Sequence, residues 1–375
     1  MLVEQDIASP RRTSVIEFAS ALGYAILKRP ADLRANGTLA EVGGAAVLHY
    51  DPLVLYMPGG ERRTLGMPGT GADLLKHTPT VFLMAIYGSI ESQARVMRFR
   101  RAAILHRWRW PKHRFVFLCN TEKEEALLRG TGEVAVFLNH NLLISVTDFQ
   151  PVDGEPLLFD AVYNGRLHPQ KRHELSILVD RCAMIFAHTF MESDVYEKEL
   201  IARHARVAPG HRFINQFRNG IPEYLDPPAV NRIYNQSAVG LALSAVEGAM
   251  YASIEYLLSG LPVVSTPNRG GRDVYFDDEF CITVEPDPRA VRDAVTALKS
   301  RNIPRHYIRA RTLAKIERDR GRFCALLQSV IERPGGSASH FGGWPFRSKL
   351  VTWKAWSDHF ADIQARRLTG LDAAI

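Results

Sequence analysis

A chain of 375 residues with 46% hydrophobic content is long enough to build two domains, each with its own core. Its four cysteines have no paired spacing, which excludes a disulfide framework and a cysteine zinc site and favours a reducing cytoplasm. The first residues lack an apolar core of signal-peptide length, and no apolar run is long enough to span a bilayer. We therefore expect a cytoplasmic globular protein.

The net charge of +7 comes from one stretch of the chain. Residues 95–114 hold eight Lys or Arg residues and no acidic residue, while the rest of the chain is nearly balanced. The stretch fits a solvated helix whose arginines extend over an apolar underside, a membrane-surface patch for a lipid-linked acceptor, or a nucleic-acid face. Of the two functional interpretations we prefer the membrane surface, at the inner membrane face, because nothing resembles a nucleic-acid-binding module.

The first half of the chain predicts an α/β domain over residues 1–150. Its pattern indicates a helix at 14–28, a loop rich in Gly and Pro at 56–71, and four apolar strands at 45–50, 80–87, 114–120 and 133–139. A stretch with turn residues and no periodicity at 147–157 predicts the boundary to the next domain.

The second half alternates strands with helices, which predicts a second domain over residues 155–335. The expected elements, in order, are a strand at 159–167 that runs into a loop, a helix at 171–184, a strand at 239–244, a helix at 250–260, a strand at 261–266 and a helix at 288–301. Short apolar strands between helices indicate a parallel sheet covered on both faces.

Residues 345–375 follow a linker rich in Gly and Ser and predict an amphipathic tail helix. Trp353, Trp356 and Phe360 lie on or near one face of it. This face is expected to pack against one of the two domains.

Two glutamates, Glu247 and Glu255, stand in one of the most apolar segments of the chain. A buried carboxylate costs several kcal/mol unless something pairs with it, so both side chains are candidates to face a ligand. Ligands of parallel sheets bind at the carboxyl ends of the strands, where helix amino termini present free N–H groups. Upstream, Arg166 and Lys171 follow another strand and offer cations for phosphate. Together these residues predict a site for a sugar linked to a nucleoside diphosphate.

The segments "YNGRLHPQKR" and "YNQSAVGLALSAVEGAMYASIEYLLSGLPVVSTPNRGGRDV" resemble the carboxyl-terminal domain of GT-B glycosyltransferases of the family-4, or glycosyl transferases group 1, type. The resemblance covers roughly residues 155–300. The hallmarks of that family are an Arg-x4-Lys pair, a Glu-x7-Glu motif, and a Gly-x-Pro-Val-Val strand followed by a glycine pair. They correspond here to Arg166 and Lys171, Glu247 and Glu255, Gly260 with Pro262, and Gly270–Gly271.

The resemblance implies two Rossmann-like parallel-sheet domains that face a cleft, with a C-terminal helix that crosses back to the first domain. It implies a hexosyltransferase-like enzyme that moves a sugar from a UDP- or GDP-linked donor to a hydroxyl of a glycan, lipid-linked or small-molecule acceptor. The family is usually retaining and independent of metal, and the nucleotide sugar is a substrate, so no cofactor is expected.

The resemblance also implies roles for single residues. Glu255 would bind the ribose, Glu247 the donor sugar, and Arg166 with Lys171 the departing diphosphate. The remaining expected donor contacts are Gly248, Ala249 and Met250.

This sequence departs from the family at Met250, which replaces a glycine whose backbone approaches the donor. The family often places a histidine of the first domain near the reacting carbon, and the candidates here are His49, His106 and His140. His49 follows an apolar strand and precedes Tyr50 and Asp51, a position that fits an active-site rim, but a structural role is the expectation for each histidine taken singly. Two other functions stay open: a catalytically reduced GT-B module that binds a nucleotide or a partner, and a nucleotide-sugar epimerase.

Overall fold

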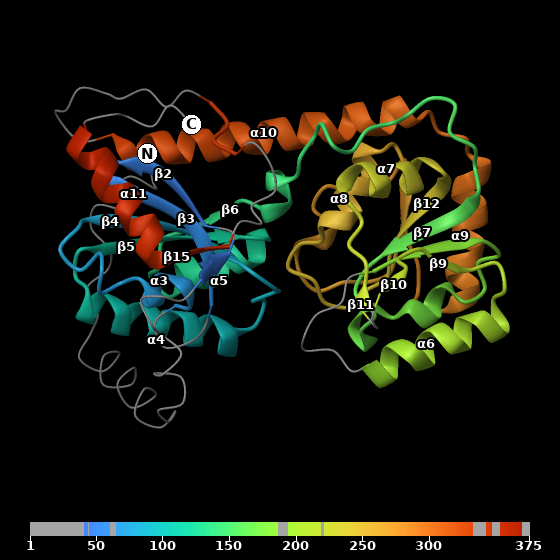
Figure 1. Cartoon of the computed structure of the whole chain (residues 1–375), viewed down its shortest axis with the longest axis horizontal. Coiled ribbons are helices and arrows are strands. Elements are labelled where there is room, and N and C mark those ends of the chain that lie inside the picture. The colour runs from blue at the N-terminus through green and yellow to red at the C-terminus, as the bar shows by residue number, and fades with distance from the viewer. Residues whose placement is uncertain are drawn as a thin grey trace. The chain divides into compact units, whose positions relative to one another are not determined.

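The computed structural model describes residues 41–43, 45–60, 65–186, 194–218, 221–332, 343–346 and 353–369. The chain forms two compact units, each built on one predominantly parallel sheet flanked by helices (Figure 1). Unit 1 comprises Met1–Leu143 with Asp319–Ile375, and unit 2 comprises Ile144–Arg318. The turn-rich stretch 147–157 thus lies just inside unit 2. The helix predicted at 14–28 lies outside the described residues.

The sheet of unit 1 has five strands in the order β2-β3-β4-β5-β6, and only the edge strand β2 runs antiparallel to its neighbour. The bounds of these strands are Ala46–Tyr50, Leu53–Gly59, Thr80–Ile86, His113–Cys119 and Ala135–Phe137. The two central strands, β4 and β5, are apolar along most of their length and buried, as expected for a sheet covered on both faces. The four strands predicted in this half are confirmed, while β3 was missed.

Helices cover the sheet of unit 1 and complete its core. The ones between the strands are α3 Met67–Thr70, α4 Gln93–Arg109 and α5 Glu122–Gly130, with the 3-10 turn η2 at His140–Leu143. The start of α5 follows from its capping: the Thr121 hydroxyl accepts from the Glu124 N–H at 3.2 Å, and acidic residues occupy the first turn.

The end of the chain packs onto unit 1. Helix α10 covers Arg305–Ile331, and the division between the units falls inside it. Beyond it, β15 Trp353–Ala355 pairs antiparallel with β1 Glu41–Gly43, and α11 runs from Trp356 to Thr369. Ile363 belongs to the core of unit 1 and Phe360 packs against it, so the predicted tail helix contacts the first domain. The side chains of Trp353 and Trp356 lie outside the described residues.

The sheet of unit 2 has six parallel strands in the order β14-β13-β12-β7-β8-β9. The bounds of β7, β8, β9, β12, β13 and β14 are Phe159–Asn164, Cys182–Ile185, Arg212–Phe213, Ser237–Ala242, Val263–Ser265 and Cys281–Thr283. The strand order runs outward in both directions from the neighbours β7 and β12. This is a topological switch point, where open α/β sheets bind ligands at the carboxyl ends of their strands.

The helices that flank the sheet of unit 2 are α6 Asp194–Val207, α7 Pro227–Asn235, α8 Tyr251–Leu258 and α9 Pro288–Ser300. The short strands β10 Phe217–Arg218 and β11 Ile221–Pro222 form a hairpin. Asp226 and Asp287 cap α7 and α9, and each is followed by a proline at the first helical position. The helices predicted at 250–260 and 288–301 are confirmed.

The helix predicted at 171–184 is wrong. The segment forms two 3-10 turns, η3 Pro169–Lys171 and η4 His173–Ser176, and then the buried strand β8. Arg172 separates the turns with a φ of 54°, a left-handed conformation that a continuous right-handed helix cannot contain. The helical spacing of apolar residues in this segment arises from two different elements.

Candidate functional site

The switch point of unit 2 brings two predicted site loops together. The loop after β7 carries Lys171, the loop after β12 carries Glu247, and the Lys171 ammonium forms an ion pair with the Glu247 carboxylate. The two side chains are 12% and 17% exposed, so the pair lies at the edge of solvent. The residues are 76 positions apart in the chain. Their contact shows that the loops after the two strands meet.

Two side chains hold the loop that carries Lys171 by hydrogen bonds to backbone carbonyls. The Gln170 side-chain amide donates to the Val246 carbonyl at 2.7 Å, and the Tyr163 hydroxyl donates to the Lys171 carbonyl. Burial raises the pKa of Tyr163, and the nearby Glu247 charge acts in the same direction, so its hydroxyl stays protonated as a donor. These two hydrogen bonds therefore anchor the loop at Gln170 and Lys171.

A third loop, after β13, joins the other two. The Glu247 N–H donates to the Arg269 carbonyl at 3.1 Å, and the Arg269 N–H donates to the Ala245 carbonyl at 2.9 Å. The Gly271 N–H donates to the Gly248 carbonyl at 2.7 Å. The glycine pair of the sequence motif thus fixes the backbone that carries Glu247.

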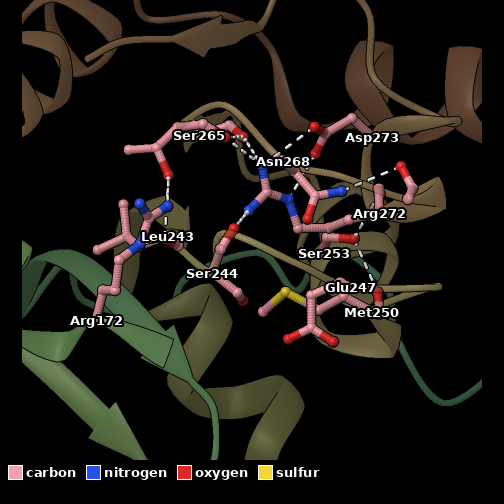
Figure 2. A network of polar contacts seen from close by, with 12 residues as sticks. Arg172, Leu243, Ser244, Glu247, Met250, Ser253, Ser265, Asn268, Arg272 and Asp273 are labelled. Carbon is pink, nitrogen blue, oxygen red and sulfur yellow. Dashed lines mark hydrogen bonds and ion pairs between the residues drawn. The ribbon is translucent and has the colours of Figure 1, made fainter. Parts of the chain in front are cut away.

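A buried arginine, Arg272, ties the carboxyl ends of β12 and β13 together (Figure 2). Its side chain is 0% exposed, and its guanidinium donates to the carbonyls of Ser244 and Thr266, each at 2.5 Å, and to the Ser265 hydroxyl at 2.6 Å. Its charge is paired with Asp273, at 2.6 Å from Nε to Oδ1. The guanidinium presents five N–H donors in one plane, so it reaches these separate acceptors at the same time.

Arg172 adds a second guanidinium to the same strand ends. It donates to the Leu243 carbonyl at 2.6 Å and to the Thr266 hydroxyl at 2.7 Å (Figure 2). Burial lowers the pKa of Arg172, and the positive charge of Arg272 lowers it further. Arg172 is half-buried, and the His173 ring is fully buried against Tyr163. Burial lowers the pKa of His173 to about 3, so the ring is neutral.

Glu255 lies in the second turn of α8 and is 6% exposed. Its carboxylate accepts from the Tyr234 hydroxyl at 2.8 Å. Neither Tyr234 nor Arg272 was identified from sequence. Arg272 directly follows the glycine pair, which is a usable signal, whereas nothing in the sequence around Tyr234 marks it as a partner of Glu255.

The start of α8 carries the remaining predicted donor contacts. Gly248 is buried, Ala249 is half-buried, and Met250 is buried and is the N-cap residue, with φ −132° and ψ 106°. This extended conformation suits any residue, so the methionine at the family's glycine position causes no backbone strain. No side chain caps α8; the Ser253 hydroxyl donates instead to the Met250 carbonyl, at 2.8 Å.

Arg166 is exposed, two residues past the end of β7. It lies on the same loop as Lys171, and the structure places it at the carboxyl edge of the sheet as the sequence predicts. The site roles of Arg166, Lys171, Glu247 and Glu255 remain predictions.

The three candidate histidines all belong to unit 1. His49 lies in β2, with Nδ1 2.8 Å from the Pro52 carbonyl, and His140 begins η2 with its ring at the edge of Tyr87. His106 is buried in α4, and its Nε2 lies 2.9 Å from Nδ1 of His113. His106 is therefore part of a packed histidine pair inside unit 1.

The basic stretch 95–114 is not one exposed face. It forms α4 and the start of β5, and the side chains of Val96 and Phe99 belong to the core of unit 1. Arg100 and Arg107 both pair with the buried Glu133, at 2.6 and 2.7 Å. The stretch is an amphipathic helix over an apolar core, with part of its charge neutralised inside the unit.

Among the residues that the structure describes, no group of three or more His, Cys, Asp and Glu side chains could hold a metal ion. None of the described helices is long and apolar enough to cross a membrane.

No protein-family model and no curated protein matches the sequence. Solved structures do match. Sucrose-phosphate synthase from Thermosynechococcus elongatus aligns with a TM-score of 0.50 at 16% identity, over 69% of this chain and 68% of that chain. HepE from Anabaena in complex with UDP aligns at 0.51 and 14%, over 69% and 74%. The N-terminal domain of trehalose-6-phosphate phosphatase from Candida albicans aligns at 0.51 and 10%, over 74% and 70%.

These neighbours and the two parallel-sheet units define the fold as GT-B, with two Rossmann-like domains. At these identities the similarity establishes the fold and not the reaction.

Proposed function

We propose that this protein is a glycosyltransferase that moves a sugar from a nucleoside-diphosphate donor to a hydroxyl acceptor, and that unit 2 binds the donor. The observation that carries the proposal is the Lys171–Glu247 ion pair at the switch point of a parallel sheet. A cation for phosphate and a carboxylate for sugar hydroxyls meet there, beside the start of α8. The neighbour HepE, described in complex with UDP, makes UDP the first nucleotide to test.

In the proposed reaction, the bond between the anomeric carbon and the terminal phosphate oxygen breaks, the acceptor hydroxyl oxygen bonds to that carbon, and the hydroxyl proton passes to the departing diphosphate or to solvent. Negative charge develops on the departing diphosphate, where Arg166 and Lys171 stabilise it electrostatically. Glu247 orients the sugar, Glu255 the ribose, and the main chain of Gly248–Met250 lies along the donor. Retention of configuration and independence from metal belong to the proposal through the family resemblance.

The proposal is tested first by ligand-induced stabilisation. The purified chain is heated with UDP, GDP, dTDP, ADP and their common sugar conjugates, because a ligand at one hundred times its dissociation constant adds about 2.7 kcal/mol to stability. We expect one nucleotide family to raise the melting temperature, and both Lys171→Ala and Glu255→Ala to lose that shift. Lys299→Ala is the matched control, since Lys299 pairs with Asp160 at the amino end of β7, opposite the site.

The reaction itself is followed by product analysis with the donor so selected. Release of the nucleoside diphosphate together with a glycosylated acceptor supports the proposal. An isomerised nucleotide sugar formed without acceptor would instead identify an epimerase. Binding without turnover on a broad acceptor panel would identify a catalytically reduced module.

A further inference from the structure

Three side chains from three elements form a short relay beside the donor site. The Asn164 side-chain amide, at the end of β7, donates to the Tyr234 hydroxyl at 2.6 Å. That hydroxyl, at the end of α7, donates to Oε2 of Glu255 in α8 at 2.8 Å. Tyr234 is fully buried, so no bulk water competes for its hydroxyl.

The direction of the relay follows from its donors. A tyrosine hydroxyl has a single proton, and because the Asn164 amide already donates to its oxygen, that proton is directed at the Glu255 carboxylate. Burial raises the pKa of Tyr234, and the Glu255 charge raises it further, so the phenol keeps its proton. The Tyr234 hydroxyl therefore donates to Glu255 and to no other group of the relay.

The Tyr234 hydroxyl fixes one oxygen of the Glu255 carboxylate. Fixing a long side chain costs conformational entropy, and this hydrogen bond contributes to the order of Glu255 before any ligand arrives. Side chains on a helix lean toward its amino terminus, which for Glu255 is the side of the Glu247 loop. Ordering a polar group in advance lowers the cost of binding a ligand to it.

We infer that Tyr234 is a positioning residue that aims the Glu255 carboxylate at the ribose hydroxyls of the donor, and that the relay thereby selects ribonucleotides over 2′-deoxyribonucleotides. The inference rests on the proposed function for the presence of a nucleotide. A carboxylate has two oxygens that accept from the adjacent hydroxyls of ribose, and 2′-deoxyribose removes one of those donors.

The test is a titration calorimetry comparison of UDP and GDP with their 2′-deoxy forms on the full chain. We expect the wild type to prefer the ribonucleotide, and Tyr234→Phe to reduce that preference about tenfold, since a hydrogen bond to a charged group contributes on the order of 1.5–3 kcal/mol. Glu255→Gln should reduce the preference as well. The double variant should match Glu255→Gln alone, because both changes act on one interaction.

Tyr256→Phe is the matched control. Tyr256 is also fully buried, its ring packs edge-on against Tyr234 with centroids 5.0 Å apart, and its hydroxyl accepts from the Asn164 backbone N–H at 2.6 Å. Its loss should leave the preference for ribose within twofold of the wild type. Thermal melting of both variants verifies that each remains folded.

The outcomes separate this inference from the proposed function. Unchanged ribose preference in Tyr234→Phe, with tight binding of the ribonucleotide, would overturn the role of Tyr234 and leave the donor site intact. An equal loss of preference in Tyr256→Phe would overturn it too, because it would show a general effect of buried hydroxyls. Failure of the wild type to bind either nucleotide would overturn the proposed function and the inference with it.

Discussion

Replacing Arg272 by methionine removes the guanidinium that joins the carboxyl ends of β12 and β13 while keeping a side chain of similar length. The buried Ser244 carbonyl and Ser265 hydroxyl then lose a donor, while the Thr266 carbonyl keeps a longer hydrogen bond from the Ser265 hydroxyl at 3.3 Å. Each buried acceptor left unsatisfied costs about 1–3 kcal/mol, and burial of the methionine offsets about 1.5–3 kcal/mol. At the middle of these ranges two acceptors cost about 4 kcal/mol and burial offsets about 2 kcal/mol, so the free energy of unfolding should fall by about 2 kcal/mol.

The chain contains a matched control for this change. Arg292 and Asp293 in α9 form another pair of adjacent residues, at 2.7 Å, but the Arg292 side chain is 45% exposed. An exposed pair contributes about 0–1 kcal/mol, so Arg292→Met should alter stability by less than about 0.5 kcal/mol. The contrast between the two variants isolates the effect of burial.

The assay is equilibrium urea denaturation followed by circular dichroism. All five tryptophans of the chain belong to unit 1, so their fluorescence does not follow the unit that carries Arg272. A loss below about 1 kcal/mol for Arg272→Met, or an equal loss for Arg292→Met, would refute the assignment of Arg272 as the group that joins the strand ends.

Three other predictions concern stability. Burial lowers the pKa of His204 to about 4, below the value near 6.5 of an unfolded chain. The unfolded state therefore binds more protons between about pH 6.5 and 4, and stability falls as the pH falls through that window. In His204→Gln the difference between the urea midpoints at pH 7 and pH 5 should shrink. Glu133→Gln, which leaves two arginines without their shared carboxylate, should lower the stability of unit 1 by about 3 kcal/mol, measured by tryptophan fluorescence. Gly260→Ala should destabilise by more than about 1 kcal/mol, because φ is 78° and a Cβ would lie 2.7 Å from the Arg305 carbonyl oxygen, whereas Gly321→Ala in α10, with open space around it, should stabilise by roughly 0.5–1 kcal/mol.

The strands that the sequence predicted share one property, a run of apolar residues bounded by turn residues. Strand β3, "LVLYMPG", was missed because its proline and glycine fall inside the loop pattern that follows it. Strand β8 was absorbed into a helix because its apolar residues continue the spacing of the preceding turns. The left-handed backbone of Arg172 separates the two turns, and residues 177–181, which are neither helix nor strand, separate the second turn from β8. A single sequence reveals neither break.

The contact between Lys171 and Glu247 was predictable because both follow the carboxyl ends of strands in one parallel sheet. The buried groups behind them were not. Arg272 and Tyr234 belong to residue types that are common at surfaces and loop ends, and their burial results from packing of elements far apart in sequence. The sequence therefore predicted that these two loops meet and missed the buried side chains behind them.

The most direct test of the donor site is the affinity of the chain for UDP and GDP beside uridine and guanosine, measured by calorimetry in the wild type and in Lys171→Ala. We predict that one diphosphate binds at least about tenfold more tightly than its nucleoside, which corresponds to about 1.4 kcal/mol. Lys171→Ala should largely remove that difference and leave nucleoside binding unchanged. Equal affinity for diphosphate and nucleoside, or a difference that survives Lys171→Ala, would contradict a diphosphate site at Lys171.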